Sequence, residues 1–174
     1  KTITIQLKKI KNMTTSKEGI AVKMVLDAWY SKVNQFDKLL AELSDEQLLN
    51  EVSPGRNRGI YLLGHLTVLA NSMLPLLGFG ENPTPHWVTP FVKTPDKQTS
   101  DLPSAGELRQ EWKKAKTVLG EHIAATSTDE WFRKHTSVSE EDFAKEPHRN
   151  KLNVMLSRAC HVDYHLGQLI FLKN

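Results

Sequence analysis

His161 and His165 are the one pair of histidines in this 174-residue chain that is separated by four positions. On an α-helix this spacing places two side chains on the same face, about 6 Å apart along the axis. Two imidazoles at that separation can bind one divalent metal ion. The spacing alone is weak evidence, because the chain contains seven histidines. The residues around the pair therefore decide how it is interpreted.

The helix that carries the pair has two faces. Taking 100° per residue, the stripe that contains both histidines also contains Ser157, Arg158 and Gln168. The broad apolar face points roughly 125° away from this stripe, which by itself would place the histidines in solvent. However, only two residues between positions 152 and 172 are charged, and a solvated face normally carries more. We therefore expect the helix to be covered on more than one side, with a polar site set into it.

His65 is the candidate third ligand. It lies in the stretch 59–80, which contains 22 residues and no charged side chain, and which predicts a helix buried by its neighbours. A buried imidazole needs a hydrogen-bonding partner or a metal ion. A lone histidine in an apolar helix is more often a core residue satisfied by hydrogen bonds. The combination of His65 with the His161/His165 pair favours a metal ligand instead.

A site of this kind indicates catalysis by the metal rather than by a protein side chain. Three neutral imidazoles leave a divalent ion with its full charge and with open coordination positions, which is typical of catalytic sites. Such an ion acidifies a bound water, or binds and deprotonates a thiol, and a soft thiolate suits zinc or nickel. The catalytic group would be a metal-bound water or thiolate, and no catalytic side chain is assigned.

Two familiar metalloenzyme motifs are missing. Val162 occupies the position of the general-base glutamate in His-Glu-x-x-His, which disfavours a peptidase. No Glu-x-x-His segment occurs in the chain, so a ferritin-like di-iron site lacks its ligands.

Several neighbours of the histidines carry weaker expectations. The side chains that could orient a substrate or a water, or equally well pack between helices, are Gln168, Arg158 and Tyr164. Asp163 projects about 200° from His161, so we do not expect it to touch the metal. Cys160 is expected to be a buried small hydrophobe. Trp87 lies in a proline-rich segment that could cover the site.

Two segments of the chain resemble the DinB-like superfamily. The first runs from Arg56 to Leu66 and contains Gly64 and His65. The second runs from Cys160 to Leu169 and matches the signature His-x-x-x-His-x-Gly-Gln. The chain length, the order of the helices and the single histidine on the second helix are also similar, so the resemblance spans most of residues 13–174.

This resemblance implies a fold and a site. The fold is a four-helix bundle of up-down-down-up topology, and the site is a divalent metal ion, often nickel or zinc, held by three histidines. Carried over residue by residue, the ligands are His65, His161 and His165. Similar proteins include thiol-dependent S-transferases and an isomerase that use low-molecular-weight bacterial thiols, and many members have no known reaction. The resemblance specifies the site better than the substrate.

Helical periodicity of the apolar residues independently predicts four long helices. They span about 16–43, 57–74, 104–126 and 150–172. Pro75 is expected to end or kink the second helix, and the proline-rich stretch 81–103 to be an irregular crossover. A short helical turn is predicted at 129–134. Capping boxes are predicted at Thr15/Glu18, Ser44/Gln47 and Ser104/Glu107. The fold class is all-α, a four-helix bundle with a long crossover connection.

Composition predicts a single soluble globular domain. The 23 basic and 20 acidic residues give a net charge of +3, which is too small to indicate a nucleic-acid partner. A single cysteine excludes an intramolecular disulfide and favours a reducing cytoplasm. The charge-free second helix contains residues that are costly in lipid, including His65 and Asn71, so a membrane span is disfavoured.

The domain is predicted to span residues 13–174. Residues 1–12 lack the apolar block of a signal peptide and are expected to be an N-terminal extension without a fixed structure.

Three functional hypotheses follow. The first is a cytoplasmic metal-dependent enzyme, either a thiol-dependent S-transferase or a small hydrolase, that acts on a small molecule and uses a low-molecular-weight thiol. The second is a non-catalytic metal-binding protein of the stress or DNA-damage response. The third is a bundle that merely dimerises through its second and fourth helices and needs no metal. A homodimer is compatible with the first two hypotheses and is expected.

Overall fold

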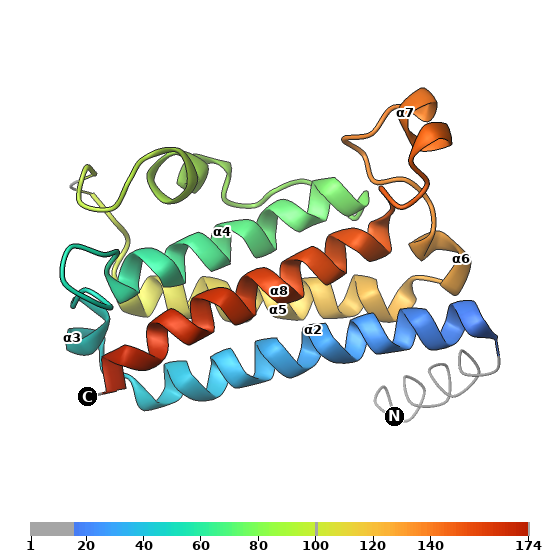
Figure 1. Cartoon of the computed structure of the whole chain (residues 1–174). Coiled ribbons are helices and arrows are strands. Elements are labelled where there is room, and N and C mark those ends of the chain that lie inside the picture. Colours follow the sequence, from blue (N-terminus) through green and yellow to red (C-terminus); the bar gives the residue numbers. More distant parts are fainter. Residues whose placement is uncertain (1–15, 100, 174) are drawn as a thin grey trace.

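The structure, a computed structural model, describes residues 16–99 and 101–173. All regular elements in those ranges are helices, which confirms the all-α prediction. The long helices lie side by side (Figure 1). They are α2 (Lys17–Glu42), α4 (Gly59–Leu77), α5 (Ala105–Ala125) and α8 (Lys151–Leu169). The predicted extension, residues 1–12, lies outside the described residues.

The long helices point in two directions. In Figure 1, α2 and α8 run toward the end of the molecule that carries the short helix α3 (Asp45–Leu48), whereas α4 and α5 run away from it. The connection from α4 to α5 therefore travels back along the bundle before α5 begins. It was expected to be irregular, but it contains the 3₁₀ turn η1 (Pro85–Trp87) and the π-helical turn η2 (Thr89–Lys93). Both turns begin with a proline in their first two positions, where the missing amide costs no internal hydrogen bond.

Local capping determines where most helices begin. The capping boxes predicted at Ser104/Glu107 and Ser44/Gln47 are present and begin α5 and α3. The box predicted at Thr15/Glu18 is wrong. Ser16 caps α2 instead, because the helix begins one residue later than that box requires, and the Ser16 hydroxyl accepts a hydrogen bond from the Gly19 amide at 3.0 Å.

Helix α4 continues past Pro75, where the sequence predicted its end or a kink. Pro75 lies in the last turn, and the helix ends at Leu77, followed by the cap residue Gly78, which adopts the left-handed conformation with φ of 74°. Thr136 also caps this end. Its amide donates to the Leu76 carbonyl at 3.0 Å, and its hydroxyl donates to the Pro75 carbonyl at 2.9 Å. These contacts satisfy carbonyl groups that a helix end would otherwise leave unpaired.

The connection from α5 to α8 contains more helix than predicted. The short turn expected at 129–134 corresponds to α6 (Thr128–Trp131), and the additional helix α7 (Glu140–Lys145) was not predicted. Ser139 begins α7 by accepting a hydrogen bond from the Asp142 amide. After α8 the chain forms the 3₁₀ turn η3 (Ile170–Lys173).

Helix α4 is the most deeply buried of the long helices. It is long and apolar enough to cross a membrane by length and composition, yet 72% of its most apolar window is buried inside the fold. Its neighbours are α5, α8 and the two turns of the crossover. Each large apolar side chain that it removes from water stabilises the fold by about 1.5–3 kcal/mol. Its apolar sequence is therefore explained by its position in the protein core.

Candidate metal centre

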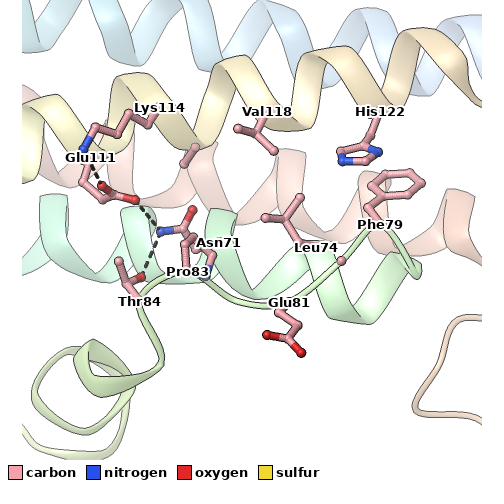
Figure 2. Close-up of a pocket in the computed structure, with 12 residues that line it drawn as sticks. Asn71, Leu74, Phe79, Glu81, Pro83, Thr84, Glu111, Lys114, Val118 and His122 are labelled. Atoms are coloured by element: carbon pink, nitrogen blue, oxygen red, sulfur yellow. Dashed lines mark hydrogen bonds and ion pairs between the residues drawn. The ribbon is translucent and has the colours of Figure 1, made fainter.

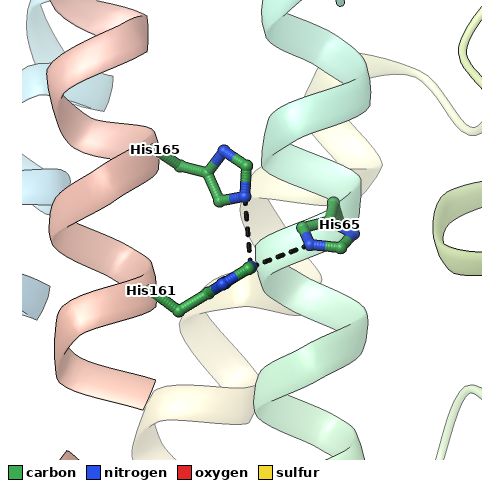
Figure 3. Close-up of side chains that lie close together, drawn as sticks. All are labelled: His65, His161 and His165. Atoms are coloured by element: carbon green, nitrogen blue, oxygen red, sulfur yellow. Dashed lines mark hydrogen bonds between the residues drawn. The ribbon is translucent and has the colours of Figure 1, made fainter. Parts of the chain in front are cut away.

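Helix α8 packs against both α2 and α4, which explains its two faces. Its contacts with α2 are the more extensive, and they bury the broad apolar face. The histidine stripe turns toward α4 instead, so His161 and His165 point at His65 across the interface between the two helices (Figure 3). His165 is only 8% exposed, and the other two histidines are partly buried. The expectation of a polar site covered by a neighbouring helix is confirmed.

The three predicted ligand residues lie together. The Nε2 atom of His161 is 3.0 Å from Nε2 of His65 and 3.1 Å from Nε2 of His165. One ring nitrogen from each of the three residues lies within 4.8 Å of the others. In a tetrahedral zinc site with Zn–N bonds of about 2.0–2.1 Å, the nitrogens lie about 3.3 Å apart. The spacing of the three nitrogens is therefore close to that of a metal-binding site.

Two of the imidazoles are fixed in one tautomer by oxygen acceptors. Nδ1 of His65 donates to the backbone carbonyl of Phe91 at 2.7 Å, and Nδ1 of His165 donates to the Gln168 side-chain oxygen at 2.7 Å. Because each Nδ1 is the protonated nitrogen and donates a hydrogen bond to an oxygen, each Nε2 is unprotonated and presents a free lone pair. Metal-binding histidines are usually oriented in this way by a partner on the second nitrogen.

The crossover is attached to one face of α4 in an ordered series. Arg58 pairs with Asp96 at 2.7 Å, and the Tyr61 hydroxyl donates to the Thr94 carbonyl at 2.9 Å. His65, one turn further along, donates to Phe91. Tyr61 and His65 are spaced at i and i+4 on one face of α4, and Arg58 is the residue that immediately precedes the helix, while the crossover runs past them in the opposite direction. This attachment places the Phe91 carbonyl beside His65.

The surroundings keep the imidazoles neutral. Burial, with the neighbouring imidazoles and Arg158 acting in the same direction, lowers the pKa of His161 to about 4. Burial also lowers the pKa of His65 and of His165, although the hydrogen bonds to Phe91 and Gln168 act in the opposite direction. Neutral imidazole is the form that binds a metal ion. The donor set, three neutral nitrogens with two fixed tautomers, fits a divalent ion such as zinc or nickel.

The other side chains of α8 near the histidines differ in whether they reach the cluster. Gln168 meets His165 and also donates to the Tyr164 hydroxyl at 3.3 Å. Asp163 points away from the histidines and pairs with Lys32 of α2, as expected from its angle on the helix. The prediction for Cys160 is wrong, because its side chain is exposed.

The part of the crossover that touches the cluster was not predicted. Trp87, the residue considered as a cover, packs edge-on against Phe91, with ring centroids 6.2 Å apart. The contact to the histidines comes from the Phe91 backbone. A backbone carbonyl leaves no signature in a sequence, so no residue type could have identified this contact.

A pocket of about 460 Å³, lined by residues of α4, α5 and the start of the crossover, was also not predicted (Figure 2). Its polar centre is Asn71, which is 1% exposed and donates to Thr84 at 2.9 Å and to Glu111 at 3.1 Å. The signal in the sequence was Asn71 itself, a polar side chain in a charge-free helix. The pocket includes none of the three clustered histidines. The pocket is therefore separate from the histidine cluster.

Comparison with known proteins identifies a family that the chain matches. A family model described as the DinB superfamily matches residues 29–169, and this range contains all three histidines of the cluster. No curated protein matches the chain.

Proposed function

The chain belongs to the DinB superfamily, and from this premise we propose that it is a metal-dependent enzyme whose three-histidine centre serves a thiol-dependent S-transfer reaction. The proposed ligands are His65, His161 and His165, and the proposed ion is zinc or nickel. The observation that carries the proposal is the convergence of three Nε2 atoms from two helices. We also propose that the bundle has the up-down-down-up topology of this superfamily.

The side chains around the centre have defined tasks in this proposal. When bound, the ion supplies Lewis acidity, which lowers the pKa of a bound thiol or water. The Phe91 carbonyl accepts a hydrogen bond from Nδ1 of His65, and the Gln168 side-chain oxygen accepts one from Nδ1 of His165. These bonds keep both Nε2 lone pairs directed at one point. Burial keeps the three imidazoles neutral at physiological pH. The chain thus supplies a rigid, uncharged ligand set.

The absence of a carboxylate from the cluster favours S-transfer over hydrolysis. Among the described residues, no Asp or Glu joins the three histidines. Attack by water in many zinc hydrolases relies on a general-base glutamate, whereas a thiolate bound to the metal is already deprotonated. A small hydrolase is the second candidate. In both cases the partner is a small molecule, and we expect the protein to act as a cytoplasmic homodimer without nucleic acid or membrane.

Elemental analysis of protein purified without an affinity tag tests the centre. We expect about one equivalent of zinc or nickel per chain, and loss of this metal in a His161→Ala/His165→Ala double variant. His148→Ala is the matched control, because His148 is exposed and lies outside the cluster. Absence of metal from the parent protein, even after reconstitution with zinc and with nickel, would overturn the proposal.

A non-catalytic metal protein of the stress response is the alternative. The two functions differ in the coordination of the ion. A catalytic site keeps an exchangeable position, whereas a structural site is closed by a fourth protein ligand. Thiol titration of the cobalt-substituted protein separates them, because only an open site develops thiolate-to-metal absorption. If the protein binds no metal, the third possibility, a bundle that merely dimerises, is left.

A further inference from the structure

Arg158 is a partly buried cation for which the described part of the chain supplies no partner. It lies on α8 three residues before His161 and seven before His165, on the same face of the helix. Its Nε is buried and makes no hydrogen bond to any described residue. Burial lowers the pKa of its guanidinium because it removes water from the charged group. A nearby carboxylate would raise the pKa again, and no such effect from a described residue acts on Arg158.

Other arginines in comparable positions are paired. Arg58, Arg109 and Arg149 are also partly buried, and each meets a carboxylate: Arg58 meets Asp96 at 2.7 Å, Arg109 meets Asp45 at 3.0 Å, and Arg149 meets Glu146 at 3.2 Å. A buried charge without a partner is costly. Arg158 differs from these arginines in its position beside the histidine cluster. A contribution to fold stability therefore does not explain why an unpaired arginine lies at position 158.

The charge around the cluster is positive. Arg158 lowers the pKa of His161 and of His65, and no carboxylate is among the groups that act on the three histidines. A divalent ion on neutral imidazoles would add two further positive charges within the same partly water-excluded region. Such a region attracts anions, and guanidinium binds carboxylates, sulfonates and phosphates through parallel N–H donors.

We infer that Arg158 binds an anionic group of the substrate, so that the thiol used at this centre is one that also carries an acid group. The inference rests on the proposed metal centre and narrows its substrate class. The thiol sulfur would go to the ion and the acid group to Arg158. A neutral thiol of the same size would lack the second contact.

A pair of matched thiols tests this inference by binding rather than by turnover. Cobalt(II)-substituted protein is titrated, without air, with 2-mercaptoethanesulfonate and with 2-mercaptoethanol, and the thiolate-to-cobalt absorption reports occupancy. A sulfonate is a poor metal ligand, so a preference for the first thiol measures the cation and not chelation. We expect the parent protein to bind the sulfonate thiol about tenfold more tightly.

Three variants locate the source of the preference. In Arg158→Gln the preference should fall to about threefold or less, and in Arg158→Lys, which keeps the charge without the planar donors, it should be intermediate. Arg133→Gln is the control for loss of one charge, because Arg133 is highly exposed, and it should keep the full preference. Cobalt content and thermal unfolding check that each variant is folded and loaded.

The outcomes separate this inference from the proposed function. No cobalt absorption in the parent protein overturns the metal centre and the inference with it. Cobalt binding without any thiolate absorption overturns the thiol reaction. Equal affinity of the parent for the two thiols, or an unchanged preference in folded Arg158→Gln, overturns the inference alone. If Arg158→Gln does not fold, the comparison of the parent with Arg158→Lys decides.

Discussion

The ring of Phe91 fills the space left by the missing side chain of Gly64, while the backbone carbonyl of Phe91 accepts a hydrogen bond from Nδ1 of His65. A Cβ atom at Gly64 would lie 2.1 Å from Cε1 of the Phe91 ring, and the carbonyl oxygen is 2.7 Å from Nδ1 of His65. One residue of the crossover therefore both packs on α4 and orients a proposed ligand. Packing and metal affinity should change together when this contact is disturbed.

Gly64→Ala tests this coupling. The added methyl group must displace the Phe91 ring, so we expect the free energy of unfolding to fall by about 1–3 kcal/mol and the zinc affinity to fall about tenfold or more. Urea unfolding of the metal-free protein and competition with a chelator measure the two effects. Gly120→Ala is the control, because nothing lies within 4 Å of a Cβ there, and it should be neutral or stabilising. Unchanged metal affinity in Gly64→Ala would show that the Phe91 position does not matter for the ligand.

Gln168→Leu removes the acceptor that fixes His165. The Nδ1 proton then loses its 2.7 Å partner, so we expect zinc affinity to fall about 10–100-fold with a smaller effect on stability. Gln168→Glu keeps an oxygen acceptor at this position and should retain most of the affinity. Chelator competition on the three proteins makes the comparison. If Gln168→Leu binds zinc as tightly as the parent protein, Gln168 has only a packing role.

Asp96→Asn tests the attachment of the crossover to α4. The Asp96 side chain is 2% exposed and pairs with the Arg58 side chain and backbone amide, so we expect the variant to lose about 3 kcal/mol of stability at pH 7. Burial raises the pKa of Asp96, but the hydrogen bonds and charge of Arg58 outweigh burial and leave the pKa below its ordinary value. A lowered carboxyl pKa stabilises the fold above the unfolded pKa of about 3.9, and this contribution disappears as the pH falls through the folded pKa.

The difference between parent and Asp96→Asn should therefore be full at pH 7 and smaller at pH 3. Urea unfolding at the two pH values measures it. If the free energies of unfolding of the two proteins differ by the same amount at both pH values, the charge of the Asp96 carboxylate is not the source of the stability difference.

Metal binding should persist to lower pH than ordinary imidazoles allow. Burial lowers the pKa of all three histidines, to about 4 for His161. A lowered pKa keeps the nitrogen lone pairs free as the pH falls, so protons compete less with the ion. We expect zinc affinity to change little between pH 8 and pH 6.5 and to fall only below that range. A steep loss centred at or above about pH 6.5, the ordinary histidine pKa, would contradict this expectation.

The sequence predicted the parts of the site that depend on local periodicity. The His161/His165 pair, the caps at Ser44 and Ser104 and the burial of α4 all follow from residues close together in the chain. Contacts between distant segments were not predictable in this way. The Arg58–Asp96 pair and the contact of the Phe91 carbonyl with His65 depend on how the crossover folds back over α4. The cap that Thr136 places on the end of α4, 61 residues after Pro75, is a contact of the same kind. The exposure of Cys160 was also not predicted.

The separation of 96 residues between His65 and His161 determines when the ion can bind. In an unfolded chain, bringing the two residues together costs about 4 kcal/mol of loop entropy. A zinc finger, whose ligands are close in sequence, folds around its metal. Here α4 and α8 must first pack, and only the folded bundle offers three nitrogens to an ion. For the proposed metal centre, we therefore expect a cell that is short of metal to accumulate folded, metal-free protein that can bind the ion later without renewed synthesis.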